Sequence, residues 1–241
     1  MTTAFLIALA LLGILSGATA AVVGFGIGSL LTPLLALRID MATAVAAVAL
    51  PHAAATALRC WRLRHAIDWS VARRFGLLSA LGGLVGALLY TRLGGGVLTL
   101  VLAVLLILTG ISGLTSFPRQ LNVRRAAWAL GLVSGFFGGI AGNQGGVRSA
   151  ALMTFELTPT AFVATATVTA LLVDLARTPV YFWRAGTALT ELVVPLAIAT
   201  GGVLVGTLLG EKILLGMAPA RFRRTVSLAI LALGVFLLTR A

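Results

Sequence analysis

The chain has 241 residues, of which 60% are hydrophobic and 10% charged, with a formal net charge of +12. The mean hydropathy is +1.10, and long apolar blocks recur from end to end. Because a hydrocarbon core of roughly 30 Å needs about 20 apolar residues per crossing helix, this composition predicts an all-α, polytopic helical membrane protein. It excludes a soluble enzyme, since no segment is long and polar enough to form a separate soluble domain.

The basic residues mostly fall in short loops between apolar blocks, where arginine and lysine set membrane orientation. We therefore interpret the positive charge as a topology signal and expect no nucleic-acid partner. The first residues, MTTAFLIALALLGILSG, have no positive region and no clear cleavage site, so they predict a retained first helix. The expected location is a cell membrane, which the chain crosses several times.

Charge clusters and Pro/Gly punctuation divide the chain into eight apolar segments. In chain order these run over residues 4–37, 41–58, 75–91, 97–115, 126–155, 158–182, 187–210 and 222–239. The segments 4–37 and 126–155 are longer than one crossing helix needs, and each has a cluster of glycines in its middle. Each also opens a group of four segments.

This order suggests an internal duplication. A shift of 118 residues superimposes six pairs of identical residues, namely Gly13 on Gly131, Ser16 on Ser134, Gly17 on Gly135, Gly24 on Gly142, Gly28 on Gly146 and Leu34 on Leu152. We predict two pseudo-symmetric repeats, 1–118 and 119–241, within a single integral membrane domain. Each has a glycine-broken first segment followed by three transmembrane helices. Such repeats are typical of transporters, whose sites lie at the repeat interface near the midplane.

The long segments allow two topologies. If each is a single broken helix, the chain makes eight crossings with the N-terminus inside. If each is a hairpin of two half-helices, the N-terminus lies outside and the two repeats are inverted. The hairpin topology places more of the basic clusters on one side, as the positive-inside rule requires, and alternating access favours inverted repeats. We favour the hairpins.

The stretch GNQGGVR, residues 142–148, places polar groups inside the second long segment. Glycines at this density fit either close helix packing or an unwound break whose free N–H groups attract an anion. A charged Arg148 at mid-membrane costs roughly 2.5 to 3.5 kcal/mol, so it normally faces a partner, a cavity or a substrate. An ion pair or snorkelling is the alternative for Arg148. Its guanidinium could bind an oxyanion bidentately, which favours a small anion as the ligand.

The candidate substrate-binding residues come from both glycine clusters. They are Gly142, Asn143, Gln144, Gly145, Gly146 and Arg148 in the second half, and Gly24, Gly26, Gly28 and Ser29 in the first. The first cluster has no polar side chain except Ser29, so we expect an asymmetric site. The second half would hold the anion, and the first would supply backbone and flexibility.

A second polar group comprises Asp174 and Arg177, together with His52 in the first half. Asp174 and Arg177 share a helix face at i, i+3 and are expected to pair. Asp174 could instead neutralise Arg148 or carry a proton. A histidine in an apolar run is more often a packed side chain, but His52 titrates near neutral pH and is the candidate for proton coupling. These three are candidate coupling or gating residues.

The other polar residues give weaker indications of function. The hydroxyls of Thr165, Thr167 and Thr169 could line a polar path, although bonding back to their own helix is favoured. The sequence has no metal-ligand spacing, no Ser/His/Asp set and no nucleotide-binding loop. We therefore expect no enzyme activity, no metal and no cofactor.

The two glycine-rich stretches, SGATAAVVGFGIGSLLTPLL and SGFFGGIAGNQGGVRSAAL, each open a four-segment half. This pattern resembles the sulfite exporter TauE/SafE family of bacterial membrane permeases over nearly the whole chain. The resemblance implies transport of sulfite, organosulfonates or related sulfur anions across the bacterial inner membrane. The sequence departs from the pattern at Ala20 and Ala21, which align with glycines in the second half, and at Ala151, which aligns with Pro33.

We expect a secondary transporter, a permease or exporter, for a small sulfur oxyanion bound between the two glycine-rich breaks. A passive anion channel is the first alternative, and a membrane-embedded enzyme or assembly factor is the second. The expected partners are the anion, the lipid bilayer and a coupling ion, either a proton or sodium. A homodimer stays open.

Overall fold

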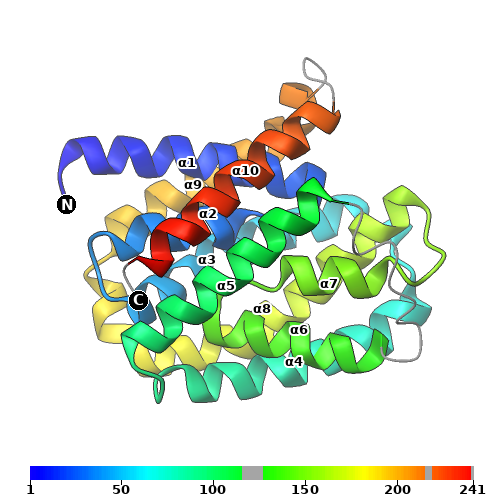
Figure 1. The fold of residues 1–241 in the computed structure, drawn as a ribbon, viewed down its shortest axis with the longest axis horizontal. Helices are drawn as coiled ribbons and strands as arrows, with labels where there is room; N and C mark the ends of the chain where they lie inside the picture. Colours follow the sequence, from blue (N-terminus) through cyan, green and yellow to red (C-terminus); the bar gives the residue numbers. More distant parts are fainter. Residues whose placement is uncertain (116–126, 215–218, 240–241) are drawn as a thin grey trace.

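The computed structural model describes residues 1–115, 127–214 and 219–239, and within these ranges the chain is entirely helical, with no strand (Figure 1). The helices are α1 (Thr3–Val23), α2 (Ile27–Ala36), α3 (Met41–Leu63), α4 (Trp69–Tyr90), α5 (Gly95–Leu114), α6 (Ala127–Ala141), α7 (Gly145–Leu152), α8 (Pro159–Thr190), α9 (Val193–Leu214) and α10 (Pro219–Leu238), with a short 3₁₀ turn, η1 (Arg64–Ala66), after α3. The expected division between residues 118 and 119 lies outside the described ranges.

The helices have the lengths and surfaces of membrane-spanning elements. Six of the described helices are long and apolar enough to cross a bilayer, namely α1, α3, α4, α5, α8 and α9. Large apolar side chains on their outer faces are exposed, for example Ile7, Leu11 and Leu15 along α1. A contiguous apolar exterior of this kind is stable in lipid and not in water. The chain is therefore a multi-pass membrane protein.

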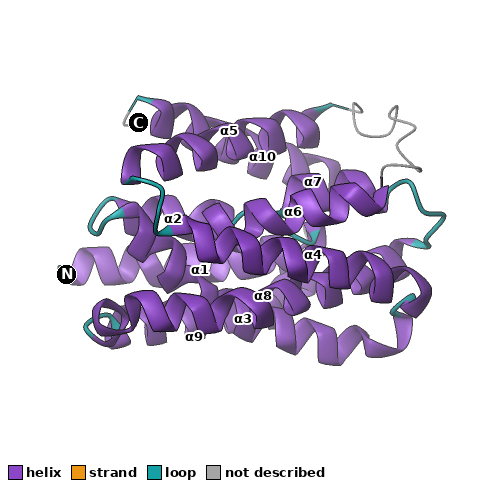
Figure 2. Cartoon of the chain, turned by 90° about the horizontal axis from the view of Figure 1, so that it is seen from below, coloured by secondary structure: helices purple, strands orange, loops and turns teal. Residues whose placement is uncertain are grey.

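The first long segment consists of two helices separated by a break. α1 ends at Val23, Gly24 follows with φ 83°, and α2 begins at Ile27 after Gly26, whose φ is 135°. Only glycine adopts such φ values without steric cost, so this sequence can reverse the chain inside the membrane. The N-terminus and the turn after α2 lie at the same end of the bundle, and α2 runs back beside α1 (Figures 1 and 2).

The second long segment has the same form. α6 ends at Ala141, Gly142 follows with φ 70°, and α7 begins at Gly145. α7 runs back towards the end of the bundle at which α6 began (Figure 1). α6 and α1 start at opposite ends of the bundle in this view. Because α2 and α7 have only 10 and 8 residues, each ends well short of a full crossing.

Glycines bring two pairs of helices, α1 with α9 and α4 with α6, into direct backbone contact. α1 packs along α9, where a Cβ on Gly17 would overlap the carbonyl oxygen of Val203. α6 packs along α4, where a Cβ on Gly135 would overlap the carbonyl oxygen of Ser79. Small residues at such crossings allow the close van der Waals contact that holds helices together in lipid. The shorter α2 packs against α3 and α1, and α7 packs against α6 and α5.

Polar caps determine where several helices begin. Asp40 begins α3, where its carboxylate accepts from the N–H of Thr43 at 2.9 Å. Thr158 begins α8, where its hydroxyl oxygen accepts from the N–H of Ala161 at 3.3 Å. Asp68 caps α4 in the same way, which makes that helix start earlier than the apolar segment expected at 75–91.

The expected segments otherwise differ from the helices at their ends. The segment 158–182 was expected to end before Trp183 and Arg184, but α8 continues through them to Thr190. Both side chains are exposed on the helix surface, and the guanidinium of Arg184 stacks over the ring of Trp183 with 4.4 Å to its centroid. A long charged side chain near the end of a helix can extend to the membrane interface without interrupting the helix. A charged residue is therefore a poor marker of where a helix ends.

Candidate functional site

The two glycine-rich breaks meet at the centre of the molecule. A Cβ on Gly28, in the first turn of α2, would overlap the carbonyl oxygen of Gly142 in the second break. A Cβ on Gly145 would in turn lie within 2.7 Å of the Phe25 ring carbon Cγ. Glycine at these positions therefore allows the two breaks to touch, although the chain between them is more than a hundred residues long.

Arg148 connects the two breaks. It lies in α7, is 2% exposed, and donates from Nη2 to the carbonyl oxygen of Gly24 at 3.0 Å. Gly24 caps the C-terminal end of α1, so a cation of the second half binds a carbonyl at the negative end of a helix dipole in the first half. The Nε and Nη1 atoms of Arg148 have no partner among the described residues.

Other buried polar atoms around the breaks also lack partners in the part of the chain that the structure describes. They are Oγ of Ser29, Oγ1 of Thr32, Nδ2 of Asn143, both amide atoms of Gln144 and Nε of Arg59. Burying such a group without a hydrogen bond is costly, so unpaired polar atoms at one place indicate a ligand or ordered water. The amide and guanidinium nitrogens in this set are donors, the two hydroxyls can donate or accept, and Oε1 of Gln144 is an acceptor.

Asp174 lies at the centre of a buried ion network. Its Oδ2 is 2.7 Å from Nδ1 of His52 on α3, and its Oδ1 is 2.8 Å from Nη2 of Arg177 on α8. The expected pairing of Asp174 with Arg177 is thus present in the structure. His52 also lies 3.4 Å from the hydroxyl of Thr56. The network joins α3 to α8, which pack against each other through the middle of the molecule.

Arginines also donate hydrogen bonds to the last turn of α1 and of α6, the two helices that end at the breaks. Arg59 on α3 donates from Nη1 to the carbonyl oxygen of Ala20 in the last turn of α1. Arg177 on α8 donates from Nη1 to the carbonyl oxygen of Gly138 in the last turn of α6. The hydroxyl of Tyr181 donates to the next carbonyl, that of Gly139, at 2.5 Å. These bonds satisfy carbonyl groups that a helix end leaves without partners inside the membrane.

The buried charges do not balance. Among the side chains that the structure describes, three buried arginines (Arg59, Arg148 and Arg177) face one buried carboxylate, Asp174. Three positive charges and one negative charge leave a surplus of two, and His52 adds no negative charge in either protonation state. Helix-end carbonyls offset only part of this surplus, since each helix end is equivalent to about half a charge. The arrangement therefore favours an anion.

Several of the remaining candidate residues pack against side chains of neighbouring elements. Gly26 lies against the side chain of Thr19, and Gly146 lies against the side chain of Thr109 on α5. Asn143 and Gln144 lie within the second break and are both buried. Of the three threonines on α8, Thr165 accepts a hydrogen bond from the N–H of Asp68 at 3.0 Å and thus fixes the turn before α4.

Arg59 is the residue that sequence reasoning missed. It is not among the candidate site residues, although it is only 4% exposed. The signal that identifies it is the 118-residue shift, because 59 + 118 = 177 pairs it with Arg177.

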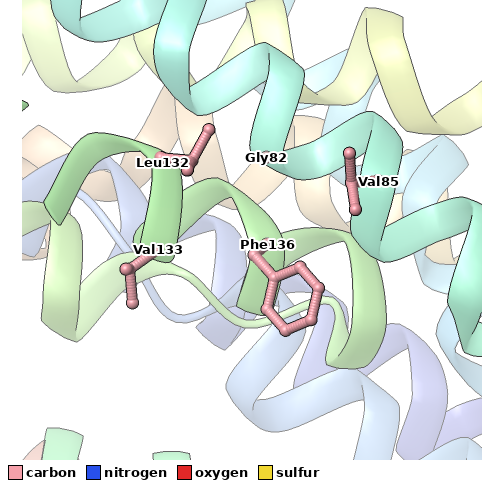
Figure 3. Close-up of a pocket in the computed structure, with 5 residues that line it drawn as sticks. All are labelled: Gly82, Val85, Leu132, Val133 and Phe136. Atoms are coloured by element: carbon pink, nitrogen blue, oxygen red, sulfur yellow. The ribbon is translucent and has the colours of Figure 1, made fainter. Parts of the chain in front are cut away.

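A surface hollow of about 160 Å³ lies elsewhere, between α4 and α6 (Figure 3). Its lining is wholly apolar and consists of Gly82, Val85, Leu132, Val133 and Phe136. Val85, Leu132 and Val133 are also exposed on the outer face of the helices. The hollow has no group that could hold a charge, so it is separate from the polar centre.

The fold and its polar centre define a polytopic helical membrane protein. The family model described as Sulfite exporter TauE/SafE matches residues 9–237, which is nearly the whole chain. The chain therefore belongs to this family and is a transmembrane transport protein. No curated protein and no solved structure matches it.

Proposed function

We propose that the chain is a secondary transporter that carries a sulfur oxyanion, sulfite or an organosulfonate, across the bacterial inner membrane. One observation carries this proposal: buried, unpaired donors and a surplus of buried positive charge lie together where the two breaks meet. An oxyanion supplies both the charge and the acceptor oxygens that these groups lack. Membership of the sulfite exporter family supports sulfur as its central atom.

We infer that the two halves are inverted repeats that alternate access to this site. The bond from Arg59 to Ala20 and the bond from Arg177 to Gly138 each join residues 39 apart. The two bonds are related by one shift, since 177 − 59 = 118 and 138 − 20 = 118. The same shift relates the positive φ angles of Gly24 and Gly142.

Further pairs support the same inference. The helix caps Asp40 and Thr158 are also 118 residues apart. Under this shift α1 corresponds to α6 and α4 to α9, and the packing of α1 on α9 corresponds to that of α6 on α4. α1 and α6 begin at opposite ends of the bundle (Figure 1), as inverted repeats require.

His52, Asp174 and Arg177 form the proposed coupling element. A histidine bound to a carboxylate can take up and release a proton, and here the pair joins α3 to α8, one helix from each half. Protonation of His52 would then change the charge beside the anion as the halves move. Sodium is the alternative coupling ion.

Replacement of Arg148 by glutamine tests the proposed anion site. Because Arg148 has no carboxylate partner among the described residues, its loss leaves no unpaired buried anion, and the variant is expected to stay folded. Sulfite and methanesulfonate binding by the detergent-solubilised protein, measured by calorimetry, should weaken by about 30-fold or more, as is typical when a buried charge contact is removed.

The matched control is Arg184→Gln, which removes a positive charge that is exposed on α8. This variant should bind sulfite as the wild type does. Equal sulfite affinity of Arg148→Gln and wild type would show that Arg148 does not contact the anion. Failure of the wild type to bind sulfite, methanesulfonate, sulfate or thiosulfate would refute the proposed ligand class.

A further inference from the structure

Arg59 and Arg177 have the same position in the two halves but different counterions. Both are almost fully buried, and both donate from Nη1 to a carbonyl in the last turn of a broken helix. Arg177 has a carboxylate three residues before it, because Asp174 accepts from its Nε at 3.1 Å. The residue three before Arg59 is Thr56, which has no charge.

The Nε atom of Arg59 is consequently without a hydrogen-bond partner in the described ranges. The charged groups around Arg59 also favour an anion beside its guanidinium. Arg148 repels Arg59. Asp174 attracts Arg59 but forms its ion pairs with His52 and Arg177, so among the described residues no carboxylate contacts Arg59 itself. A buried guanidinium with a free Nε is therefore left beside a second buried guanidinium with free nitrogen atoms.

Thr56 has the position in the first half that Asp174 has in the second, and its surroundings resemble those of Asp174. The 118-residue shift relates Asp174 to Thr56, and His52 is near both. Its Nδ1 atom is 2.7 Å from the carboxylate of Asp174 and 3.4 Å from the hydroxyl of Thr56. Thr56 is fully buried, so its hydroxyl does not face bulk solvent. A hydroxyl also occupies less space than a carboxylate group would around Arg59.

We propose that Arg59 is a substrate-binding residue, and that the transported anion takes beside Arg59 the place that Asp174 takes beside Arg177. This assignment rests on the proposed anion-transport function and specifies how the anion is held. Two oxygens of a sulfite or sulfonate group accept from Nε and a terminal nitrogen of Arg59, the side-on geometry that guanidinium prefers for oxyanions. The hydroxyl of Thr56 and a free nitrogen of Arg148 complete the contacts.

The consequence is a site to which both halves contribute a cation. Arg59 comes from α3 and Arg148 from α7, and each also binds the open end of α1. An anion held by both guanidinium groups removes their mutual repulsion and joins the two halves through the ligand. The first half therefore provides a charged ligand in addition to backbone and flexibility.

The test places a carboxylate at the position where Asp174 lies in the other half. Thr56→Asp gives Arg59 an internal counterion, and Thr56→Asn is the matched control with nearly the same shape and no charge. Thr56→Asp should stay folded, as judged by a melting temperature no lower than that of Thr56→Asn. Its affinity for sulfite should fall about 30-fold or more relative to Thr56→Asn, the size expected when a buried charge contact is lost.

Sulfite affinity of Thr56→Asp that equals that of Thr56→Asn and stays close to that of the wild type overturns this assignment while the transport proposal stands. If both Thr56 variants lose sulfite binding, Arg59→Gln decides the question. A wild type that binds none of the sulfur oxyanions overturns both. If Thr56→Asp does not fold, Arg59→Gln decides the question, because it leaves no carboxylate unpaired. Sulfite binding should weaken in Arg59→Gln by about 30-fold or more, and unchanged binding overturns the role of Arg59.

Discussion

Replacing Asp174 by alanine is expected to be the most destabilising single change in the polar centre. Asp174 is fully buried and is the acceptor for both His52 and Arg177. Without it, three buried arginines face no carboxylate among the described residues, and the tie between α3 and α8 is lost. Removing one partner of a buried ion pair costs about 3 to 5 kcal/mol. Fluorescence-detected gel filtration after heating should show a large drop in melting temperature and a low yield of monodisperse protein.

The control for this change is Asp40→Ala. Asp40 is exposed and caps α3, so its loss should cost only about 1 kcal/mol. Similar melting temperatures for Asp174→Ala and Asp40→Ala would mean that the buried network contributes little. In that case the positive charges at the centre would have to be neutralised by something other than Asp174.

The second large effect is expected for Gly28→Ala, which tests the contact between the two breaks. The new Cβ would overlap the carbonyl oxygen of Gly142, and a backbone group cannot move aside as a flexible side chain can. Overpacking of this kind costs about 1 to 3 kcal/mol. Separation of the breaks should also lengthen the bond from Arg148 to Gly24. We therefore expect both a lower melting temperature and weaker sulfite binding.

Gly201→Ala is the matched control, because it makes the same substitution inside another helix. A Cβ at Gly201 meets nothing within 4 Å, so the variant should be as stable as the wild type or more so, since alanine favours helix over glycine. Equal behaviour of Gly28→Ala and Gly201→Ala would contradict the close approach of the two breaks.

Much of the architecture could be predicted from the sequence because it depends on local rules. Apolar length predicted the membrane class, and the two overlong segments are those that contain Gly24 and Gly142, each with positive φ. Clustered glycines mark such places because few other residues can reverse the chain there. The pairing of Asp174 with Arg177 followed from their i, i+3 spacing.

The remaining features depend on contacts between distant parts of the chain. His52 lies 122 residues from Asp174, and no spacing rule connects them. Arg59 stands next to the basic cluster of residues 62–64, and it is buried because α3 packs against α8 and α9 and its guanidinium reaches the last turn of α1. A comparison of the two halves residue by residue identifies Arg59, whereas composition and hydropathy treat it as one more loop cation.

Counterflow in proteoliposomes tests the central claim most directly. Vesicles containing the purified chain are loaded with unlabelled sulfite and diluted into a trace of radiolabelled sulfite without an imposed proton or sodium gradient. A carrier with one anion site should accumulate label transiently above its equilibrium level, with saturable initial rates, and Arg148→Gln should not. Non-saturating uptake without this overshoot would indicate a passive channel. Absence of any protein-dependent sulfite movement, although the same protein exchanges another anion, would contradict the assignment of a sulfur oxyanion as its substrate.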